Sequence, residues 1–422
     1  MLIRKKIAEG VHFNTVTDAR FKFNRITIGF HMPLDEEKAS LNALIPRVLS
    51  DNNANFPHTP DFYNHLASLY NAKVDFEVRG LGDTQFWGQH IYFMDDGYSL
   101  SGEKITAIAS KTLFDCLFRP SLIDGVFPVV NTELCKRMQI EAIEAEINEK
   151  RLYAYNQANR IIHSGEPAAV NPLGTVERTR EITPERLYEA YERLLENAVI
   201  EIVCVGCNDF SDALSIAEGE FSALRRQNIT PCESVFSPLK TEVAEKTELL
   251  PLNQSKMVLG FKADACVKKD RAAFNLMSDI YGETIFSKLF LNVREKLSLC
   301  YYCWSQTNKL KSTMVVTSGV EEENIDKAKA EILAQFECMK KGDFTDEDLN
   351  HALLHEQNNV KTVNDSLGSL TWWYFTLIYQ DMICTPEEYL KIYEDVRRED
   401  IMRLANSMKL DTFYTLRAKE DA

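Results

Sequence analysis

The chain has 422 residues, of which 45% are hydrophobic and 26% charged, a balance typical of a soluble globular protein large enough for two domains. Its formal net charge of -15 argues against a nucleic-acid surface, because phosphate contacts need clustered Lys and Arg. MLIRKKIAEGVHFN at the start has positive charge but no apolar run behind it, and no later stretch approaches the roughly 18 apolar residues of a membrane span. Ten cysteines are scattered without a secretory signal, so we expect reduced thiols and a cytoplasmic protein.

The first half of the chain alternates strand and helix patterns. Apolar residues recur at helical spacing in ASLNALIPRVLS and PDFYNHLASLY, whereas NRITIGFHMP and VIEIVCVG are rich in residues that favour strands. AKVDFEVRG and TQFWGQHIYF alternate around a short polar turn, which predicts a hairpin. In chain order the predicted strands and helices lie at 24–33, 39–50, 60–70, 72–80, 84–93, 131–161, 184–196 and 199–206.

The second half repeats this order of elements. Its predicted segments lie at 256–264, 271–282, 283–296, 298–306, 313–321, 345–380, 398–408 and 412–418. Local echoes support the repeat, since VLSD (48–51) resembles LMSD (276–279) and HLASLYNAKVDF (65–76) resembles REKLSLCYYCWS (294–305). Between the halves, 222–250 carries prolines and charges with little periodicity, as a linker does.

The repeated order predicts an internal duplication of two α+β domains. Each domain is expected to be a two-layer structure, a mostly antiparallel sheet with helices packed on one face. We place the N-terminal domain at 1–221, the linker at 222–250 and the C-terminal domain at 251–422.

Two C-x-x-C pairs, Cys204/Cys207 and Cys300/Cys303, raise the question of a structural zinc site. Both pairs lie in strand-like segments, where residues i and i+3 point to opposite faces of a sheet. Gly206 could provide a turn at the first pair, but the second pair has no comparable residue. We therefore expect buried thiols rather than zinc ligands.

A second metal candidate is HALLHE (351–356), where His351 and His355 lie four residues apart on a predicted helix. This spacing places both imidazoles on one helix face, where zinc could bind. Glu356 follows the second histidine and points round the helix, so no general base is placed beside the pair. A solvated polar face is the simpler interpretation, and an independent metalloenzyme using these three residues ranks last among the alternatives.

ETIFSKLFLNVREKLSLCYYCW (283–304) resembles the C-terminal half of the pitrilysin/insulinase metallopeptidase family, which includes mitochondrial processing peptidase. The likeness rests on S-x-L-F and R-E-K-x-x-L-x-Y segments that lead from a helix into a strand. That family is itself a duplication of α+β domains joined by a linker, so the resemblance extends over the whole chain.

The resemblance implies that Arg294 and Tyr301 contact the substrate backbone beside the scissile bond. A guanidinium with several donors and a neutral phenol suit this role, because together they can hold peptide carbonyls and stabilise a developing oxyanion. On spacing alone, Arg294 could instead form a surface ion pair and Tyr301 could be a core strand residue.

In active members of that family, the helix after the β-rich N-terminal segment carries an inverted zinc motif, H-x-x-E-H, whose glutamate is the general base. In LNALIPRVLSDN the corresponding His, Glu and His positions are held by Ala43, Pro46 and Arg47. Alanine has no donor atom, proline cannot take a proton, and a charged guanidinium is repelled by zinc. These degenerate positions predict the loss of the catalytic zinc.

A later helical segment, QIEAIEAEINEK, carries Glu141, Glu144 and Glu146, any of which could occupy the position of the third zinc ligand. A carboxylate without the two histidines does not hold zinc tightly, and a solvated acidic helix face explains these residues. We therefore expect no metal and no catalytic residue in this chain.

A lost metal site combined with the Arg/Tyr pair resembles the two-chain bacterial members of the family, in which one chain carries the zinc motif and the other completes the peptide site. The resemblance implies a non-catalytic, substrate-binding subunit of a heterodimeric metalloendopeptidase, with zinc and general base on a paralogous partner chain. A bound peptide is expected to add as a strand to a sheet edge. Within this group the chain is similar to the one associated with the 5-aminopentanol modification of elongation factor P. The alternative is a non-proteolytic scaffold of the same fold, which could be a homodimer.

Overall fold

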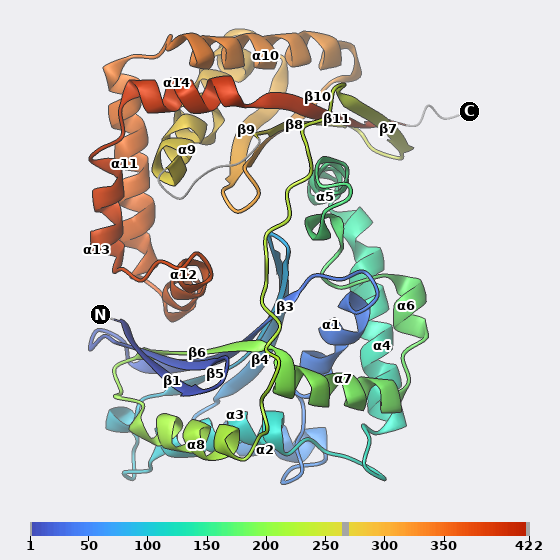
Figure 1. The fold of residues 1–422 in the computed structure, drawn as a ribbon, viewed down its shortest axis with the longest axis vertical. Coiled ribbons are helices and arrows are strands. Elements are labelled where there is room, and N and C mark those ends of the chain that lie inside the picture. Colours follow the sequence, from blue (N-terminus) through green and yellow to red (C-terminus); the bar gives the residue numbers. More distant parts are fainter. Residues whose placement is uncertain (1, 264–269, 419–422) are drawn as a thin grey trace. The chain divides into compact units, whose positions relative to one another are not determined.

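The computed structural model describes residues 2–263 and 270–418, and its contacts group the chain into two units (Figure 1). Each unit draws on both halves of the sequence. Unit 1 comprises Met1–Glu144, Val170–Glu233 and Val363–Thr385. Unit 2 comprises Ala145–Ala169, Ser234–Thr362 and Pro386–Ala422.

Unit 1 contains a six-stranded sheet in the order β1-β2-β6-β3-β5-β4. Neighbouring strands run antiparallel except for β2 and β6, which are parallel. The predicted hairpin is β4 and β5, in which Leu81 pairs with Thr84. The strands are β1 (Leu2–Ala8), β2 (Val11–Thr17), β3 (Phe23–Pro33), β4 (Lys73–Leu81), β5 (Thr84–Met94) and β6 (Val199–Gly206).

Unit 2 contains a five-stranded sheet in the order β7-β11-β8-β10-β9. The run β11-β8-β10-β9 repeats β6-β3-β5-β4, and β7 is parallel to β11 as β2 is parallel to β6. The structure thus confirms the predicted duplication and the α+β class. The strands are β7 (Ala244–Leu250), β8 (Ser255–Lys262), β9 (Cys300–Asn308), β10 (Thr313–Val320) and β11 (Lys409–Ala418).

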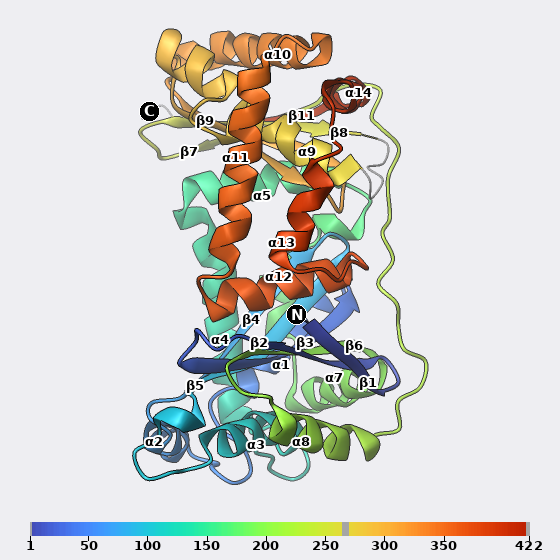
Figure 2. The same cartoon turned by 90° about the vertical axis from the view of Figure 1, so that its left-hand side faces the viewer.

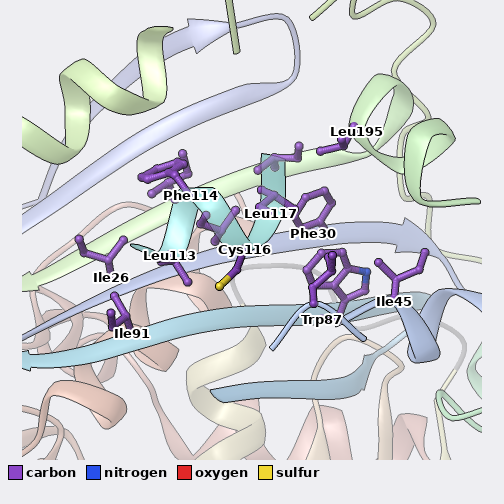
Figure 3. Packing of buried hydrophobic residues seen from close by; sticks show 14 of the residues in the cluster. Ile26, Phe30, Ile45, Trp87, Ile91, Leu113, Phe114, Cys116, Leu117 and Leu195 are labelled. Atoms are coloured by element: carbon purple, nitrogen blue, oxygen red, sulfur yellow. The ribbon is translucent and has the colours of Figure 1, made fainter. Parts of the chain in front are cut away.

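The larger hydrophobic core of unit 1 lies between one face of its sheet and helices from the first half of the chain (Figure 3). Phe30 and Trp87 stack there with ring centroids 3.9 Å apart, in the same cluster as Phe114 and Leu117 of α3. Helices from this part of unit 1 are α1 (Ala39–Val48), α2 (Thr59–Ser68), α3 (Ile105–Phe118), α4 (Val129–Glu144), α6 (Val176–Arg180), α7 (Pro184–Asn197) and α8 (Ser211–Ser222).

A helix from the second half, α12 (Leu367–Tyr379), contacts β3 and β6 in unit 1 (Figure 2). Leu370 and Phe375 of α12 pack there with Phe86, the neighbour of Trp87, on the other face of the sheet. A Cβ at Gly29 of β3 would lie 2.5 Å from the Phe375 ring, so the close approach of α12 requires glycine. Helices on both faces explain why β3 is buried along nearly its whole length.

The unit 2 sheet also has helices on both faces, and here the helix contributed by the other half of the chain comes from the first half. α5, from the first half, packs Ala158 and Ile162 against Val258 of β8, whereas Phe261 on the other face contacts Phe336 of α10. Among the described residues, no helix is long and apolar enough to cross a membrane. Helical segments of unit 2 are α5 (Lys150–Ile162), α9 (Arg271–Ser278), the π-helical η5 (Asp279–Glu283) and η6 (Leu289–Lys296), α10 (Ile325–Lys341), α11 (Asp346–Val363), α13 (Pro386–Tyr389) and α14 (Arg398–Ser407).

His31 of β3 gives unit 1 a predicted pH dependence. Its ring is buried beside Phe86, and neither ring nitrogen has a hydrogen-bond partner. Burial lowers the pKa of His31 to about 4 from an ordinary value of 6.5. A histidine whose pKa is depressed by folding contributes stability that is present above pH 6.5 and is lost as the pH falls through 4, and a shift of this size corresponds to about 3 kcal/mol.

His31→Phe should therefore flatten the loss of apparent unfolding free energy between pH 6.5 and pH 4, while leaving the protein at least as stable at neutral pH. Urea unfolding at a series of pH values measures this effect. An unchanged slope in the variant would show that His31 titrates normally in the folded chain.

Candidate functional site

Helix α1 holds Ala43, Pro46 and Arg47, the three positions that the resemblance aligns with the zinc motif. Ala43 and Pro46 are buried and offer no ligand atom. The guanidinium of Arg47 lies over the ring of Phe76, 5.0 Å from its centroid, and burial lowers its pKa. Because arginine stays charged at physiological pH, this place in unit 1 is cationic and unsuited to a metal ion.

The adjacent helix α4 turns an amide, not a carboxylate, toward α1. Gln139 is buried and donates to the backbone oxygen of Ser40 at 2.8 Å. Glu141 and Glu144 are exposed, whereas Glu146 lies in unit 2 and pairs with an arginine of α5 at 2.9 Å. The side chain of α4 that makes this hydrogen bond to α1 is therefore an amide and not one of the three predicted glutamates.

Arg294 lies on η6, a π-helical segment of unit 2 that packs against β9. Its side chain is 42% exposed, and its guanidinium lies over the ring of Phe290, 4.7 Å from the centroid. Nε is 3.6 Å from a carboxylate oxygen of Glu295, a weak and exposed ion pair. Arg294 thus presents its donors to solvent on a turn type that is rare and often found at functional sites.

Tyr301 occupies a bulge in β9, which is the edge strand of the unit 2 sheet. Cys300 pairs with Val320 and Tyr302 pairs with Gly319, so Tyr301 is the extra residue between the two pairs. Its ring is 64% exposed, and a hydrogen bond with Glu321 raises the pKa of the phenol. Tyr301 is therefore a neutral, accessible donor rather than a core residue.

The bulge also changes the relation between the two thiols that flank Tyr301. We expected Cys300 and Cys303 to point to opposite faces, but the extra residue brings them into a hydrogen bond that lowers the pKa of Cys300 to about 7. The positive charge of Arg294 acts on the same thiol. Arg294 and Tyr301 therefore border one short stretch of β9.

The two histidines of HALLHE have different surroundings. His351 stacks on Phe286 with ring centroids 4.4 Å apart, whereas Nδ1 of His355 lies 3.0 Å from Oδ1 of buried Asp279. This hydrogen bond raises the pKa of His355, and burial raises the pKa of Asp279 to about 7. The sequence showed no reason to join His355 to Asp279, which lies 76 residues earlier in the chain.

Comparison with known proteins gives consistent matches. Residues 181–354 match the family model of the peptidase M16 inactive domain. The chain is 26% identical to "Probable inactive metalloprotease YmfF" of Bacillus subtilis over 404 residues, 95% of each chain. A conserved protein from Enterococcus faecalis shares the fold with a TM-score of 0.88 and 22% identity, over 100% of this chain and 99% of that one. A protease from Helicobacter pylori shares it with a TM-score of 0.81 and 14% identity, over 99% of both chains.

The duplicated units and the altered positions on α1 define a peptidase-like protein that lacks the zinc motif of the active enzymes. The chain is therefore similar to inactive members of the peptidase M16 family, in residues 181–354 by the family model and over 95% of its length by one inactive relative.

Proposed function

We propose that this chain is the non-catalytic, substrate-binding subunit of a heterodimeric zinc peptidase. The observation that carries the proposal is a contrast between the two units. Ala43, Pro46 and Arg47 offer no zinc ligand and no general base on α1, while unit 2 presents exposed Arg294 and Tyr301 beside a sheet edge. A chain with these properties can hold a peptide, but zinc and the general base must come from elsewhere.

The edge strand β9 suits an extended peptide. An edge strand offers backbone N–H and C=O groups to an added strand, and a bulge re-aims the side chain of its extra residue. In the proposed complex the phenol of Tyr301 and the guanidinium of Arg294 donate to carbonyl oxygens beside the scissile bond. Donors placed where negative charge develops lower the barrier to attack by zinc-bound water on the partner chain.

The partner in this proposal is a paralogous chain with an intact H-x-x-E-H motif. Among the relatives of this chain, one is named a probable inactive metalloprotease and two are named zinc proteases. Helix α4 offers a surface for assembly, because Val130, Leu134 and Met138 follow one another at four-residue spacing and are 84%, 44% and 42% exposed.

We place the assembled pair in the cytoplasm. Among the described residues, Cys116, Cys135, Cys204 and Cys303 are buried free thiols, and Cys207, Cys232, Cys300 and Cys338 are half-buried ones. Free thiols are the normal state of cysteine in a reducing compartment.

Reconstitution tests the proposed function. This chain, a zinc-motif-bearing M16 chain from the same cells, and their mixture would each be assayed for cleavage of a fluorogenic peptide pool. We expect no cleavage by this chain alone and about a 100-fold higher rate for the mixture than for the partner alone. Cleavage by this chain alone, or a partner whose rate is unaffected by it, would contradict the proposal.

A non-proteolytic scaffold is the second candidate. The exposed α4 stripe of Val130, Leu134 and Met138 favours it equally, since an apolar helix face can serve a homodimer. The scaffold predicts that the reconstituted mixture is no more active than the partner, while this chain self-associates through α4.

A further inference from the structure

Three side chains of unit 2 come together outside the peptide-binding surface. Asp279 begins the π-helical turn η5 at the end of α9, and His355 and Glu356 are neighbours on α11. One ligand atom of each lies within 4.8 Å of the others. Among the described residues, this is the group of three His, Cys, Asp or Glu side chains with a geometry that could hold a metal ion.

Asp279 has an unfilled acceptor inside this group. The residue is fully buried, and its Oδ2 has no hydrogen-bond partner, although Oδ1 lies 3.0 Å from Nδ1 of His355. A buried carboxylate oxygen without a donor costs free energy unless a cation or another donor meets it. The fold therefore keeps a carboxyl oxygen in a buried position that a bound cation would explain.

Two donors hold the carboxylate of Glu356 in place. The side chains of Asn275 and Tyr393 both donate to its Oε2, Asn275 at 2.9 Å. Donors that fix one carboxylate oxygen orient the other, which is the usual arrangement around a metal ligand. The charge of Glu283 also acts on Asp279, so the surroundings of His355 are rich in carboxylates.

We propose that Asp279, His355 and Glu356 bind a divalent cation of the zinc type. One imidazole and two carboxylates form a ligand set that zinc accepts, with water as a fourth ligand. Ligand atoms about 2.1 Å from one ion lie about 3 to 3.5 Å apart, which matches the 3.0 Å between His355 and Asp279. At this one place the proposal replaces our expectation that the chain binds no metal.

The ion would have a structural role. It joins α11 to the turn between α9 and η5, and η5 is followed along the chain by η6, the element that carries Arg294. Asp279 and Glu356 are buried, while the His355 side chain is 31% exposed and gives the ion access from solvent. The π-helical turn that begins at Asp279 changes the direction of its side chain relative to a regular α-helix, and such turns often occur at functional sites.

Zinc content of the purified full chain tests this proposal without any peptidase assay, so its failure is distinct from failure of the proposed function. The chain would be dialysed against zinc chloride and free metal then removed. Inductively coupled plasma mass spectrometry should find about one zinc per chain. Saturating zinc should also raise Tm by about 5 °C relative to chain treated with chelator.

His355→Ala and Asp279→Asn should each abolish both the bound zinc and the rise in Tm. Asp279→Asn keeps the side-chain volume, so it tests the ligand even if the alanine variant folds poorly. His351→Ala is the matched control, because His351 lies one turn away on the same helix and stacks on Phe286. Absence of zinc from the unaltered chain, or full zinc content in the folded Asp279→Asn variant, would overturn the proposal.

Discussion

Replacing Tyr301 by phenylalanine is expected to lower kcat/KM of the reconstituted pair by about 100-fold, because loss of one preorganised donor to an oxyanion typically costs a factor of 10² to 10³. Arg294→Ala should have an effect of similar size. Arg294→Lys should recover only part of the activity, since an ammonium lacks the planar array of donors of a guanidinium. Cleavage of the fluorogenic peptide measures the rate, and analytical ultracentrifugation checks that the pair still assembles.

Tyr302→Phe is the matched control for Tyr301. Tyr302 is the next residue of β9, and the guanidinium of Arg151 on α5 lies over its ring, 4.7 Å from the centroid. Its hydroxyl is not part of the proposed peptide site, so its removal should leave cleavage unchanged. If Tyr301→Phe assembles normally and cleaves as fast as Tyr302→Phe, the proposed role of Tyr301 is wrong.

Glu166→Gln is expected to lower the apparent free energy of unfolding by about 3 to 5 kcal/mol, the usual cost of removing one partner from a buried ion pair. The Glu166 carboxylate is fully buried in unit 2. It lies 2.5 Å from Nζ of Lys262, 2.8 Å from Nζ of Lys311 and 3.0 Å from Nδ1 of His163. Glutamine keeps the volume but removes the charge that two buried ammonium groups share. Urea unfolding followed by circular dichroism measures the change.

The same variant should alter the response to acid. Burial alone would raise the pKa of Glu166, but hydrogen bonds from His163, Lys262 and Lys311 outweigh burial and lower it. A lowered pKa means that the contribution to stability is fully present above the ordinary value of 4.5 and is lost as the pH falls. Glu166→Gln should therefore lose less stability than the unaltered chain below this pH.

Glu347→Gln is the control for both measurements on Glu166. Glu347 is exposed in the first turn of α11, so its replacement should change the unfolding free energy by no more than about 0.5 kcal/mol. Superimposable unfolding curves for Glu166→Gln and Glu347→Gln would show that the buried ion cluster does not support unit 2.

The sequence predicted the strands and the duplication well because both sheets use strands with clear apolar patterns. VIEIVCVG forms β6 over the predicted residues, and the repeated strand order follows from the two similar halves. The predicted strand 256–264 ends at Lys262 as β8, and residue 264 lies outside the described residues. The predicted linker contains β7, whose burial is too slight to give a strong apolar signal.

The exchange of helices between the halves could not be predicted. The helical segments 131–161 and 345–380 are each two helices, and the second of each pair, α5 and α12, packs in the unit formed mainly by the other half. Apolar periodicity shows that a helix buries one face but does not identify the sheet that covers it. The hairpin of β1 and β2 was missed for a related reason, since β1 is largely exposed and lacks a clear alternation.

The candidate site was predictable in its residues but not in its geometry. Arg294 and Tyr301 follow from the resemblance, whereas the bulge at Tyr301 depends on pairing with β10. The predicted helix at 283–296 contains π-helical turns, which sequence periodicity does not reveal. Asp279 was missed as a neighbour of His355, because their contact joins η5 to α11, two elements that lie far apart in the chain.

Native mass spectrometry of this chain, tagged and purified gently from its own cells, would show whether it is bound to a zinc-bearing partner. We expect a complex with a second chain of similar mass that bears H-x-x-E-H, with a catalytic zinc that is retained when Asp279 and His355 of the present chain are replaced. A stable homodimer without such a chain would contradict it and would favour the scaffold.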